Sequence, residues 1–435
     1  IIKIARCDVR RLESLKRVCV LWLSLAGLVL ETAVYAYIWF RNYYPIVNRF
    51  NLGLKFFFKG HLLIVAIYFV LLFFFTSTYG GLKIGYLKPG DVFLSQLVSL
   101  CIVDVITYFQ ISLMGNRLVP VVYFAQALVV QLLISGIWTA FCNWVYRRVF
   151  PPREMLLVHG HRSIEDILRK FESRRDKYRI TKCVNIKEGI WKIQEEIDSG
   201  FHAVVLWDIS TEDRNKLLKY CYSRSVRVYM MPKIPDVLIA GADQLHLFDT
   251  PIFLTREYAL TVEQRMVKRM LDLVFSLILT VITSPVMLIT AICIKCYDGG
   301  PVLYKQTRCT RGGREFRIMK FRSMKVDAEK DGVARLASRN DSRITPIGKF
   351  IRMVRIDELP QLFNILIGDM SFIGPRPERP EIIAQYVEQM PEFVFRMKVK
   401  AGLAGYAQVY GKYNTTPYDK LKLDLSYIEN YSLWL

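Results

Sequence analysis

Four long apolar stretches in the first 150 residues constrain the fold of this 435-residue chain more than any other feature. Each approaches the roughly 20 residues that a helix needs to cross the hydrocarbon core of a membrane. None has the short apolar core and small-residue cleavage site of a signal peptide. We therefore predict a membrane α-helical bundle in residues 1–150, built from the stretches at 17–39, 60–78, 92–115 and 118–145.

Basic residues flank the predicted bundle at both ends and indicate its orientation. By the positive-inside rule both flanks lie in the cytoplasm, which an even number of spans allows. Basic residues in the first outer loop argue against this orientation, because the same rule would place them in the cytoplasm. The flanking cations are Arg10, Arg11, Lys16 and Arg17 before the first stretch and Arg147, Arg148 and Arg153 after the fourth, and those of the outer loop are Arg41, Arg49, Lys55 and Lys59.

Two acidic residues, Glu31 and Asp104, fall inside these apolar stretches. Ionisable groups within a membrane often mark an ion or substrate pathway. Acids with no evident partner in the sequence more often join one helix to another, and we interpret both residues as helix–helix contacts.

The chain carries 60 basic and 39 acidic residues, a formal net charge of +21. Such a charge is typical of chains that bind nucleic acid, an anionic membrane surface or phosphorylated substrates. The apolar stretches disfavour nucleic acid and leave membrane lipids and phosphorylated ligands as the expected partners. The charge is concentrated in residues 1–150 and 256–435, whereas residues 151–255 are nearly balanced.

Residues 151–255 alternate short apolar runs with amphipathic segments, which is typical of a small parallel α/β domain. We expect strands at 155–158, 203–207 and 226–231, with helices at 163–174, 187–197 and 211–223. A dinucleotide site would require the pattern G-x-G-x-x-G after the first strand, so that the backbone can approach a pyrophosphate. Only Gly160 occurs there, so we predict a degenerate Rossmann-like domain with a structural, dimerising or regulatory role.

A fifth apolar stretch at 271–293 is interrupted by Ser284 and Pro285. Proline within a helix removes a hydrogen bond and favours a kink. A helix that spanned the membrane here would place the basic last third of the chain on the outer face. We instead predict a re-entrant membrane helix at 266–294, preceded by an amphipathic interfacial segment, within a mainly α monotopic domain of residues 256–435 that stays cytoplasmic.

The residues most suited to chemistry lie between 306 and 379. Thr345 and Pro346 form a helix start, and Asp357 and Glu358 precede a further apolar helical pattern. Acidic residues at a helix start are commonly caps. With several arginines nearby, however, a carboxylate can also act as a nucleophile in a phosphate site or ligate Mg²⁺.

Three motifs in this region resemble those of the polyprenyl-phosphate hexose-1-phosphate transferases. These are the monotopic phosphoglycosyl transferases that begin exopolysaccharide, capsule and O-antigen repeat units. The resemblance covers about residues 262–435, and the preceding bundle and Rossmann-like domain are similar to the long form of the family. The motifs are KFRSM at 320–324, DELPQL at 357–362 and GDMSFIGPRPE at 368–378.

The resemblance implies transfer of a sugar 1-phosphate from a UDP-sugar to undecaprenyl phosphate, with release of UMP. The sugar would be glucose or galactose, the cofactor Mg²⁺, the location the bacterial inner membrane and the assembly a homodimer. Asp357 would form a phosphosugar-aspartyl intermediate in a ping-pong reaction, and Glu358 would bind the metal or activate the lipid phosphate.

The resemblance also assigns roles to other residues. Ser284 and Pro285 would form the break of the re-entrant helix, and the two prolines Pro375 and Pro377 would shape the loop that carries Arg376. The expected substrate contacts are Arg308, Lys320, Arg322, Arg352 and Arg376.

One alternative is a catalytically inactive membrane scaffold or regulator of polysaccharide assembly. A membrane-bound nucleotide-sugar dehydratase is disfavoured by the missing glycines after the first strand. The family usually continues with a short helix after residues 427–432, so we also expect further residues beyond Leu435.

Overall fold

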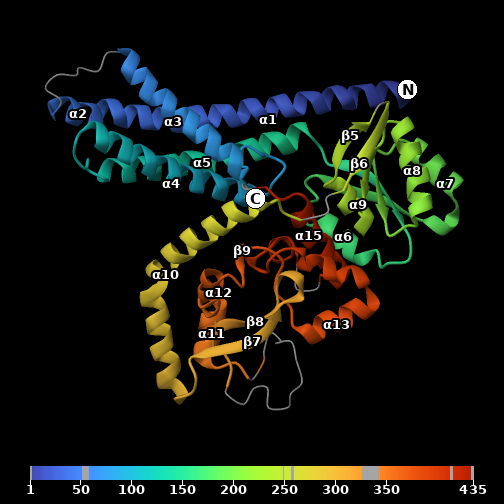
Figure 1. The fold of residues 1–435 in the computed structure, drawn as a ribbon. Helices are drawn as coiled ribbons and strands as arrows, with labels where there is room; N and C mark the ends of the chain where they lie inside the picture. The colour runs from blue at the N-terminus through green and yellow to red at the C-terminus, as the bar shows by residue number, and fades with distance from the viewer. Residues whose placement is uncertain are drawn as a thin grey trace. The chain divides into compact units, whose positions relative to one another are not determined.

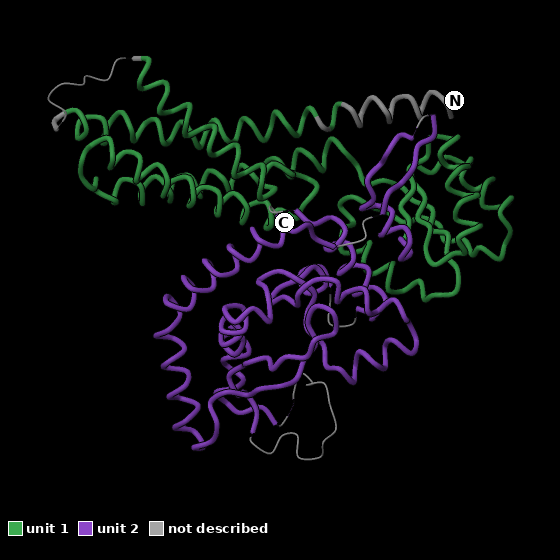
Figure 2. Tube along the Cα trace, viewed as in Figure 1, with its two compact units in different colours: residues 1–231 green, residues 232–435 purple. Residues whose placement is uncertain are grey.

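The computed structural model describes residues 2–50, 58–247, 249–255, 259–325, 341, 343–411 and 415–432. The side chains of residues 2–14, 17, 49, 50 and 58 are outside this description. The side chains of five of the cations used to orient the bundle therefore lie outside the description, namely those of Arg10, Arg11, Arg17, Arg49 and Lys55. The chain forms two compact units, residues 1–231 and residues 232–435 (Figure 2). The division into three domains stays a prediction.

The first unit contains the four predicted apolar helices. All four are long and apolar enough to cross a membrane, as the sequence predicted. The first one continues without a break through a π-helical turn, which explains why it is longer than its apolar stretch. The elements are α1 (Ile2–Ile38), η1 (Trp39–Tyr43), α2 (Tyr44–Phe50), α3 (Phe58–Tyr79), α4 (Pro89–Met114) and α5 (Val122–Val149).

The surface of this helical bundle is apolar and its interior contains polar groups. Trp22, Leu62 and Leu133 are exposed, as expected for side chains that face lipid. Inside, Tyr68 on α3 donates a hydrogen bond to Asp104 Oδ1 on α4 (2.8 Å), and Gln131 on α5 donates one to the Tyr68 hydroxyl (2.8 Å). Asp104 therefore joins helices, in agreement with the interpretation from the sequence.

A parallel sheet follows the bundle in the same unit, with the strand order β2-β1-β3-β4. Side chains of β1 alternate between two apolar cores, one that includes α6 and one that includes α7 and α8. Burial on both faces explains the unbroken apolar run of β1. The elements are β1 (Arg153–His159), α6 (Glu165–Glu172), β2 (Tyr178–Asn185), η2 (Ile186–Glu188), α7 (Ile190–Asp198), β3 (Ala203–Trp207), α8 (Thr211–Ser223) and β4 (Arg227–Met230).

The structure confirms the predicted parallel α/β arrangement and adds strand β2. This strand lies at the edge of the sheet and carries exposed charged residues, including Arg179 and Lys182, so it lacks an apolar run. Gly160 packs directly against the main chain of Asp208, where a Cβ atom would collide with the carbonyl oxygen. Close backbone packing thus accounts for this glycine without a bound dinucleotide.

The second unit begins with helix α9 (Ile234–Ala240) and the antiparallel hairpin of β5 (Asp243–Leu247) and β6 (Thr250–Leu254). All ten residues of these two strands are exposed. Several are apolar, including Leu247 and Phe253.

Helix α10 (Val262–Asp298) contains the fifth apolar stretch and is long enough to cross a membrane. The helix runs through Ser284 and Pro285 without interruption, and its ribbon bends between two arms (Figure 1). Proline at position 285 cannot donate to the carbonyl of Val281, and the Ser284 hydroxyl donates to that oxygen instead (2.8 Å). This bond satisfies a polar group that an apolar environment would leave without a partner.

The remainder of the second unit surrounds two small sheets. Strands β7 and β8 form an antiparallel hairpin, and β9 pairs with β10 in parallel. One apolar core joins β8 to α12, and a larger one joins α9, α13, η5 and α15. The elements are β7 (Leu303–Cys309), η3 (Arg311–Gly313), β8 (Glu315–Phe321), α11 (Pro346–Met353), η4 (Ile356–Glu358), α12 (Gln361–Ile367), β9 (Ser371–Ile373), α13 (Pro380–Gln389), η5 (Pro391–Lys398), β10 (Gly402–Ala404), α14 (Tyr406–Val409) and α15 (Pro417–Glu429).

Candidate active site

The adjacent carboxylates Asp357 and Glu358 lie on η4, a single 3₁₀ turn between helices α11 and α12. Helix α11 starts as the sequence predicted, with Pro346 at its first position and the Thr345 hydroxyl accepting from the Gly348 amide (2.9 Å). Arg355 then adopts a left-handed conformation with φ of 61°, which costs a non-glycine residue about 1 kcal/mol. This turn separates the carboxylates from α11 and places them before α12.

Two side chains fix the position of helix α12, which follows η4 in the chain. Asn364 is buried, and its amide bridges to the edge of β8, accepting from the Met319 amide and donating to the Arg317 carbonyl, each at 2.9 Å. Arg269, on α10, donates to the last carbonyls of α12, those of Ile365 (2.6 Å) and Leu366 (2.8 Å). A guanidinium at the end of a helix satisfies carbonyls that lack an intrahelical partner.

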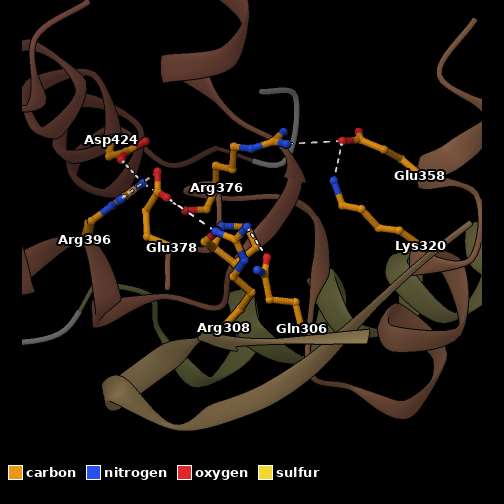
Figure 3. Close-up of polar contacts among 9 residues, drawn as sticks. Gln306, Arg308, Lys320, Glu358, Arg376, Glu378, Arg396 and Asp424 are labelled. Atoms are coloured by element: carbon orange, nitrogen blue, oxygen red, sulfur yellow. Dashed lines mark hydrogen bonds and ion pairs between the residues drawn. The ribbon is translucent and has the colours of Figure 1, made fainter. Parts of the chain in front are cut away.

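Glu358 is enclosed by cations from two distant segments. Its Oε1 atom accepts from Lys320 Nζ on β8 (2.9 Å) and from Arg376 Nη2 (3.2 Å), as Figure 3 shows. Burial alone would raise the pKa of Glu358, but the charges and hydrogen bonds of Lys320 and Arg376 outweigh burial and hold its pKa below the ordinary value. Glu358 is therefore an ionised carboxylate in a positively charged setting.

Asp357 has a different environment from its neighbour. It is 9% exposed, and within the described part of the chain its Oδ1 atom is buried without a hydrogen-bond partner. Burial raises the pKa of Asp357; the charge of Lys320 opposes this shift and that of Glu358 adds to it, so the net direction is upward. An ionised oxygen with few partners and a raised pKa is a better nucleophile than a fully solvated carboxylate.

The loop between β9 and α13 carries Arg376 and is fixed along both of its sides. Gly374 donates to the Ala404 carbonyl (2.8 Å), and Gly402 donates to the Pro375 carbonyl (2.9 Å). The backbones approach so closely at Gly374 and Gly402 that a Cβ atom at either position would collide with the opposite chain. The glycines therefore allow the loop to pack on residues 400–405 and direct Arg376 at Glu358.

A network of ion pairs, here called the network behind the loop, contacts the loop between β9 and α13 (Figure 3). Glu378 lies between Arg308 (3.6 Å) and Arg396 (3.9 Å), and Arg396 also contacts Asp424 on α15 (2.8 Å). Arg396 donates in addition to the main-chain carbonyl of Arg376 (3.0 Å). The network thus joins the backbone of Arg376 to η5 and α15.

The predicted site residues fall into distinct groups. Lys320, Arg376, Asp357 and Glu358 are brought together. Arg352 lies close enough for its charge to lower the pKa of Asp357. Two others have structural partners: Arg308 binds Gln306, the Pro377 carbonyl and Glu378, and Arg322 pairs with Asp298 at the end of α10. Pro375 and Pro377 lie in the loop, as expected.

Reasoning from the sequence did not identify Asn364, Arg396 or Asp424. Asn364 could have been noticed as the one polar residue in the apolar run LFNILI of α12. The pair of Arg396 and Asp424 has no local signal, because the two residues are joined only when η5 packs on α15.

Asp357 and Glu358 are the candidate ligands for the predicted Mg²⁺. Within the described residues there is no group of three or more metal-ligating side chains. Mg²⁺ commonly binds to one or two carboxylates and takes its other ligands from water and substrate phosphates. The unpartnered Oδ1 of Asp357 and the second oxygen of Glu358 fit that type of site.

Comparison with known proteins places this geometry in context. Residues 263–435 match the family model described as bacterial sugar transferase. The chain is similar to a UDP-N-acetylgalactosamine-undecaprenyl-phosphate N-acetylgalactosaminephosphotransferase of Aeromonas hydrophila, with 37% identity over 56% of this chain and 59% of the relative. It is also similar to the UDP-glucose:undecaprenyl-phosphate glucose-1-phosphate transferase of Escherichia coli K12, with 37% identity over 45% of this chain and 41% of the relative.

A shorter relative is matched over most of its length. A Bacillus subtilis protein, provisionally named an undecaprenyl-phosphate N-acetylgalactosaminyl 1-phosphate transferase, is 48% identical over 30% of this chain and 73% of the relative. The chain spans about half the length of the two longer relatives.

We predict that the network behind the loop is a major source of stability in the second unit. Arg396→Met leaves Asp424, which is 1% exposed, without its partner, and removing one member of a buried ion pair costs about 3–5 kcal/mol. The variant should therefore have a lower thermal midpoint in detergent. Arg396→Met combined with Asp424→Leu should recover much of the loss, and an equal loss in the double variant would contradict this account.

Proposed function

Since the chain belongs to the bacterial sugar transferase family, we propose that it transfers a sugar 1-phosphate from a UDP-sugar to undecaprenyl phosphate. The products would be undecaprenyl-diphosphate-sugar and UMP. The names of the Aeromonas and Escherichia coli relatives describe reactions of this type, which supports the assignment.

One observation carries the proposal. Two adjacent carboxylates occupy a buried turn, one enclosed by cations and the other with an unpartnered oxygen. A carboxylate used only as a helix cap would accept hydrogen bonds from backbone amides at the start of a helix. Among the described residues, the Oδ1 atom of Asp357 instead has no hydrogen-bond partner, and Lys320, Arg352 and Arg355 lie close enough for their charges to lower its pKa.

The proposed reaction has two half-reactions. In the first, an Asp357 oxygen attacks the phosphorus that is bonded to the sugar. The bond between this phosphorus and the bridging oxygen breaks, and UMP leaves with the bonding electrons. The product is an acyl phosphate that joins Asp357 to the sugar 1-phosphate.

In the second half-reaction, an oxygen of undecaprenyl phosphate attacks the same phosphorus. The bond to Asp357 breaks and the carboxylate is regenerated. Because the two substrates react in turn, one small site serves both of these anionic groups. Such ping-pong chemistry suits a pair of carboxylates with only a few cations around them.

The neighbouring residues would bind and neutralise phosphate groups. Arg376 is more accessible than Lys320, with their side chains 41% and 21% exposed, and it would contact the diphosphate. Arg352 would act on the other side of Asp357, where its Nη1 atom is buried without a partner in the described residues. Asp357 and Glu358 would hold Mg²⁺, which would neutralise charge on the diphosphate during transfer.

The identity of the sugar and the assembly of the protein are further proposals. UDP-glucose and UDP-galactose are the first donors to test, and the Aeromonas relative adds UDP-N-acetylgalactosamine.

The exposed apolar residues of the β5–β6 hairpin offer a surface for a homodimer. The product would begin exopolysaccharide, capsule or O-antigen synthesis at the inner membrane.

We also propose that α10 enters and leaves the membrane by its cytoplasmic face. The bend within the helix and the basic character of the following residues support this topology. The active site would then lie at the membrane surface, where the phosphate of undecaprenyl phosphate is accessible.

The first prediction concerns the reaction. Full-length protein in nanodiscs should release UMP from one UDP-sugar when Mg²⁺ and undecaprenyl phosphate are present. Asp357→Asn should abolish release, because the amide oxygen is a poor nucleophile, and its thermal midpoint should stay near that of the wild type. UMP release at the wild-type rate by this variant would exclude Asp357 as the nucleophile.

The same assay separates the enzyme from an inactive scaffold. A scaffold should release no UMP with any donor, and cells that produce Asp357→Asn should then still make the polysaccharide. Loss of polysaccharide in those cells would support the enzyme.

The second prediction concerns pH. Asp357 must be ionised to attack, so the rate of UMP release should fall with decreasing pH, and its raised pKa places this fall above the ordinary range of aspartate. Lys320→Gln removes a charge that lowers the pKa of Asp357, so the fall should move to higher pH. The exposed Lys349→Gln should leave the profile unchanged. A shift toward lower pH in Lys320→Gln would contradict this assignment.

The third prediction concerns topology, measured by cysteine labelling in a background in which serine replaces the native cysteines. Arg311→Cys, on an exposed turn of the second unit, should react with a membrane-impermeant maleimide only after spheroplasts are lysed. Leu118→Cys, between α4 and α5, is the matched outer-face control and should react in intact spheroplasts. The residue Asn340, in the segment after the KFRSM motif, lies outside the described residues. Labelling of Arg311→Cys in intact spheroplasts would show that α10 crosses the membrane.

A further inference from the structure

The first unit contains a cavity of about 600 Å³ that the proposed reaction does not use. Its walls come from both parts of the unit. The helical bundle contributes Lys16 on α1, Tyr146 on α5 and Tyr86 from the segment between α3 and α4. The parallel sheet and the segment before β2 contribute further walls, including Arg153 and Lys177.

The cavity is strongly cationic. Lys16, Arg153, Lys177 and Arg227 line it, and among the lining residues whose side chains the structure describes Asp176 is the one carboxylate. That carboxylate already pairs with Arg174 (3.2 Å). Burial, followed by the neighbouring charge of Arg174, lowers the pKa of Lys177 to about 8, and the charges of Lys16 and Arg153 add smaller contributions in the same direction. A ligand for this cavity would therefore be an anion.

Tyrosine rings lie beside these cations. Lys16 Nζ lies 4.6 Å from the centre of the Tyr146 ring, and Lys177 Nζ lies 4.9 Å from that of Tyr86. Lys177 also donates to the Tyr86 carbonyl (2.7 Å). These contacts orient the two ammonium groups, and those of Lys177 with Tyr86 join the sheet domain to the bundle.

The depth of the cavity relative to a membrane follows from the helix ends. The candidate spans begin at Val18 in α1 and end at Val149 in α5, next to the lining residues Lys16 and Phe150. In an up-and-down bundle, the segment between α3 and α4 lies at this same end. The cavity is therefore level with the headgroups of one leaflet, where tyrosine and basic residues are commonly enriched.

We propose that this cavity binds the phosphate group of a membrane lipid. Two sources carry the same chemistry, namely an anionic phospholipid such as phosphatidylglycerol and the polyprenyl phosphate of the proposed reaction. The site lies within residues 1–231, so it does not depend on the carboxylates of η4 or on their activity. Occupancy would add a lipid-mediated contact between the bundle and the sheet domain.

A measurement on the wild-type protein tests the proposal without any variant. Lys177 has an amine that is partly deprotonated at pH 8, so it should react with an acylating reagent when the protein is in neutral detergent. Dioctanoyl phosphatidylglycerol should slow modification of Lys177, as read by peptide mass spectrometry, and dioctanoyl phosphatidylcholine should not. Stronger protection by a short-chain polyprenyl phosphate would identify that lipid as the source and would also support the proposal.

Two results would overturn it. If neither anionic lipid slows the modification, the cavity does not bind lipid phosphate. If inorganic phosphate or UMP protects Lys177 and the lipids do not, the cavity belongs to a soluble ligand.

Lipid binding by variants, measured with native mass spectrometry, provides a second and independent test. Arg153→Gln combined with Lys177→Gln should weaken phosphatidylglycerol binding by about 25-fold, the combined effect of two charges at about fivefold each. The exposed pair Lys187→Gln and Lys219→Gln removes the same charge from the same domain and should leave binding unchanged. Arg227→Gln, at an exposed edge of the cavity, gives a milder variant if the first fails to fold. Equal loss in the control pair would show a general charge effect and contradict the site.

Discussion

The removal of two adjacent carboxylates from water, Asp357 buried and Glu358 half-buried, is the constraint on which the second unit depends. Carboxylates removed from water are costly unless cations and hydrogen-bond donors surround them. Here Lys320 reaches Glu358 from β8 and Arg376 reaches it from the loop after β9, so a sheet strand and a loop are both fixed relative to η4. Both donors contact Glu358, whereas Oδ1 of Asp357 has no hydrogen-bond partner within the described part of the chain.

The buried network behind the loop extends this constraint through the unit. Arg396 contacts Asp424 and the main chain of Arg376, so the packing of α15 determines where the loop lies. On the other side, Asp272 on α10 accepts from the Ser371 hydroxyl and the Phe372 amide of β9, each at 3.0 Å. Polar contacts therefore join helix α10 to strand β9. The loop that follows β9 carries Arg376, which contacts Glu358 on η4.

Several parts of this architecture were predictable from local patterns. The apolar stretches predicted the four helices of the bundle. The alternation of short apolar runs with amphipathic segments in residues 151–255 predicted the parallel sheet. The cap at Thr345 and the adjacent Asp357 and Glu358 were also identified. Edge strand β2 was not, because its half-exposed, charged residues lack the apolar run of a central strand. Proline at 285 was expected to break α10, yet the helix continues, since the Ser284 hydroxyl satisfies the freed carbonyl.

The sequence by itself determined which residues form helices long and apolar enough to cross a membrane, which form a parallel sheet and which carry charge suited to phosphate, since these properties depend on composition and spacing over short segments. Only the tertiary structure decided how the two carboxylates differ. Asp357 and Glu358 are neighbours in the chain, but Lys320 and Arg376, 37 and 19 residues from Asp357, both contact Glu358. Contacts between distant segments set the burial and the local charge of each carboxylate, and no local pattern in the sequence encodes them.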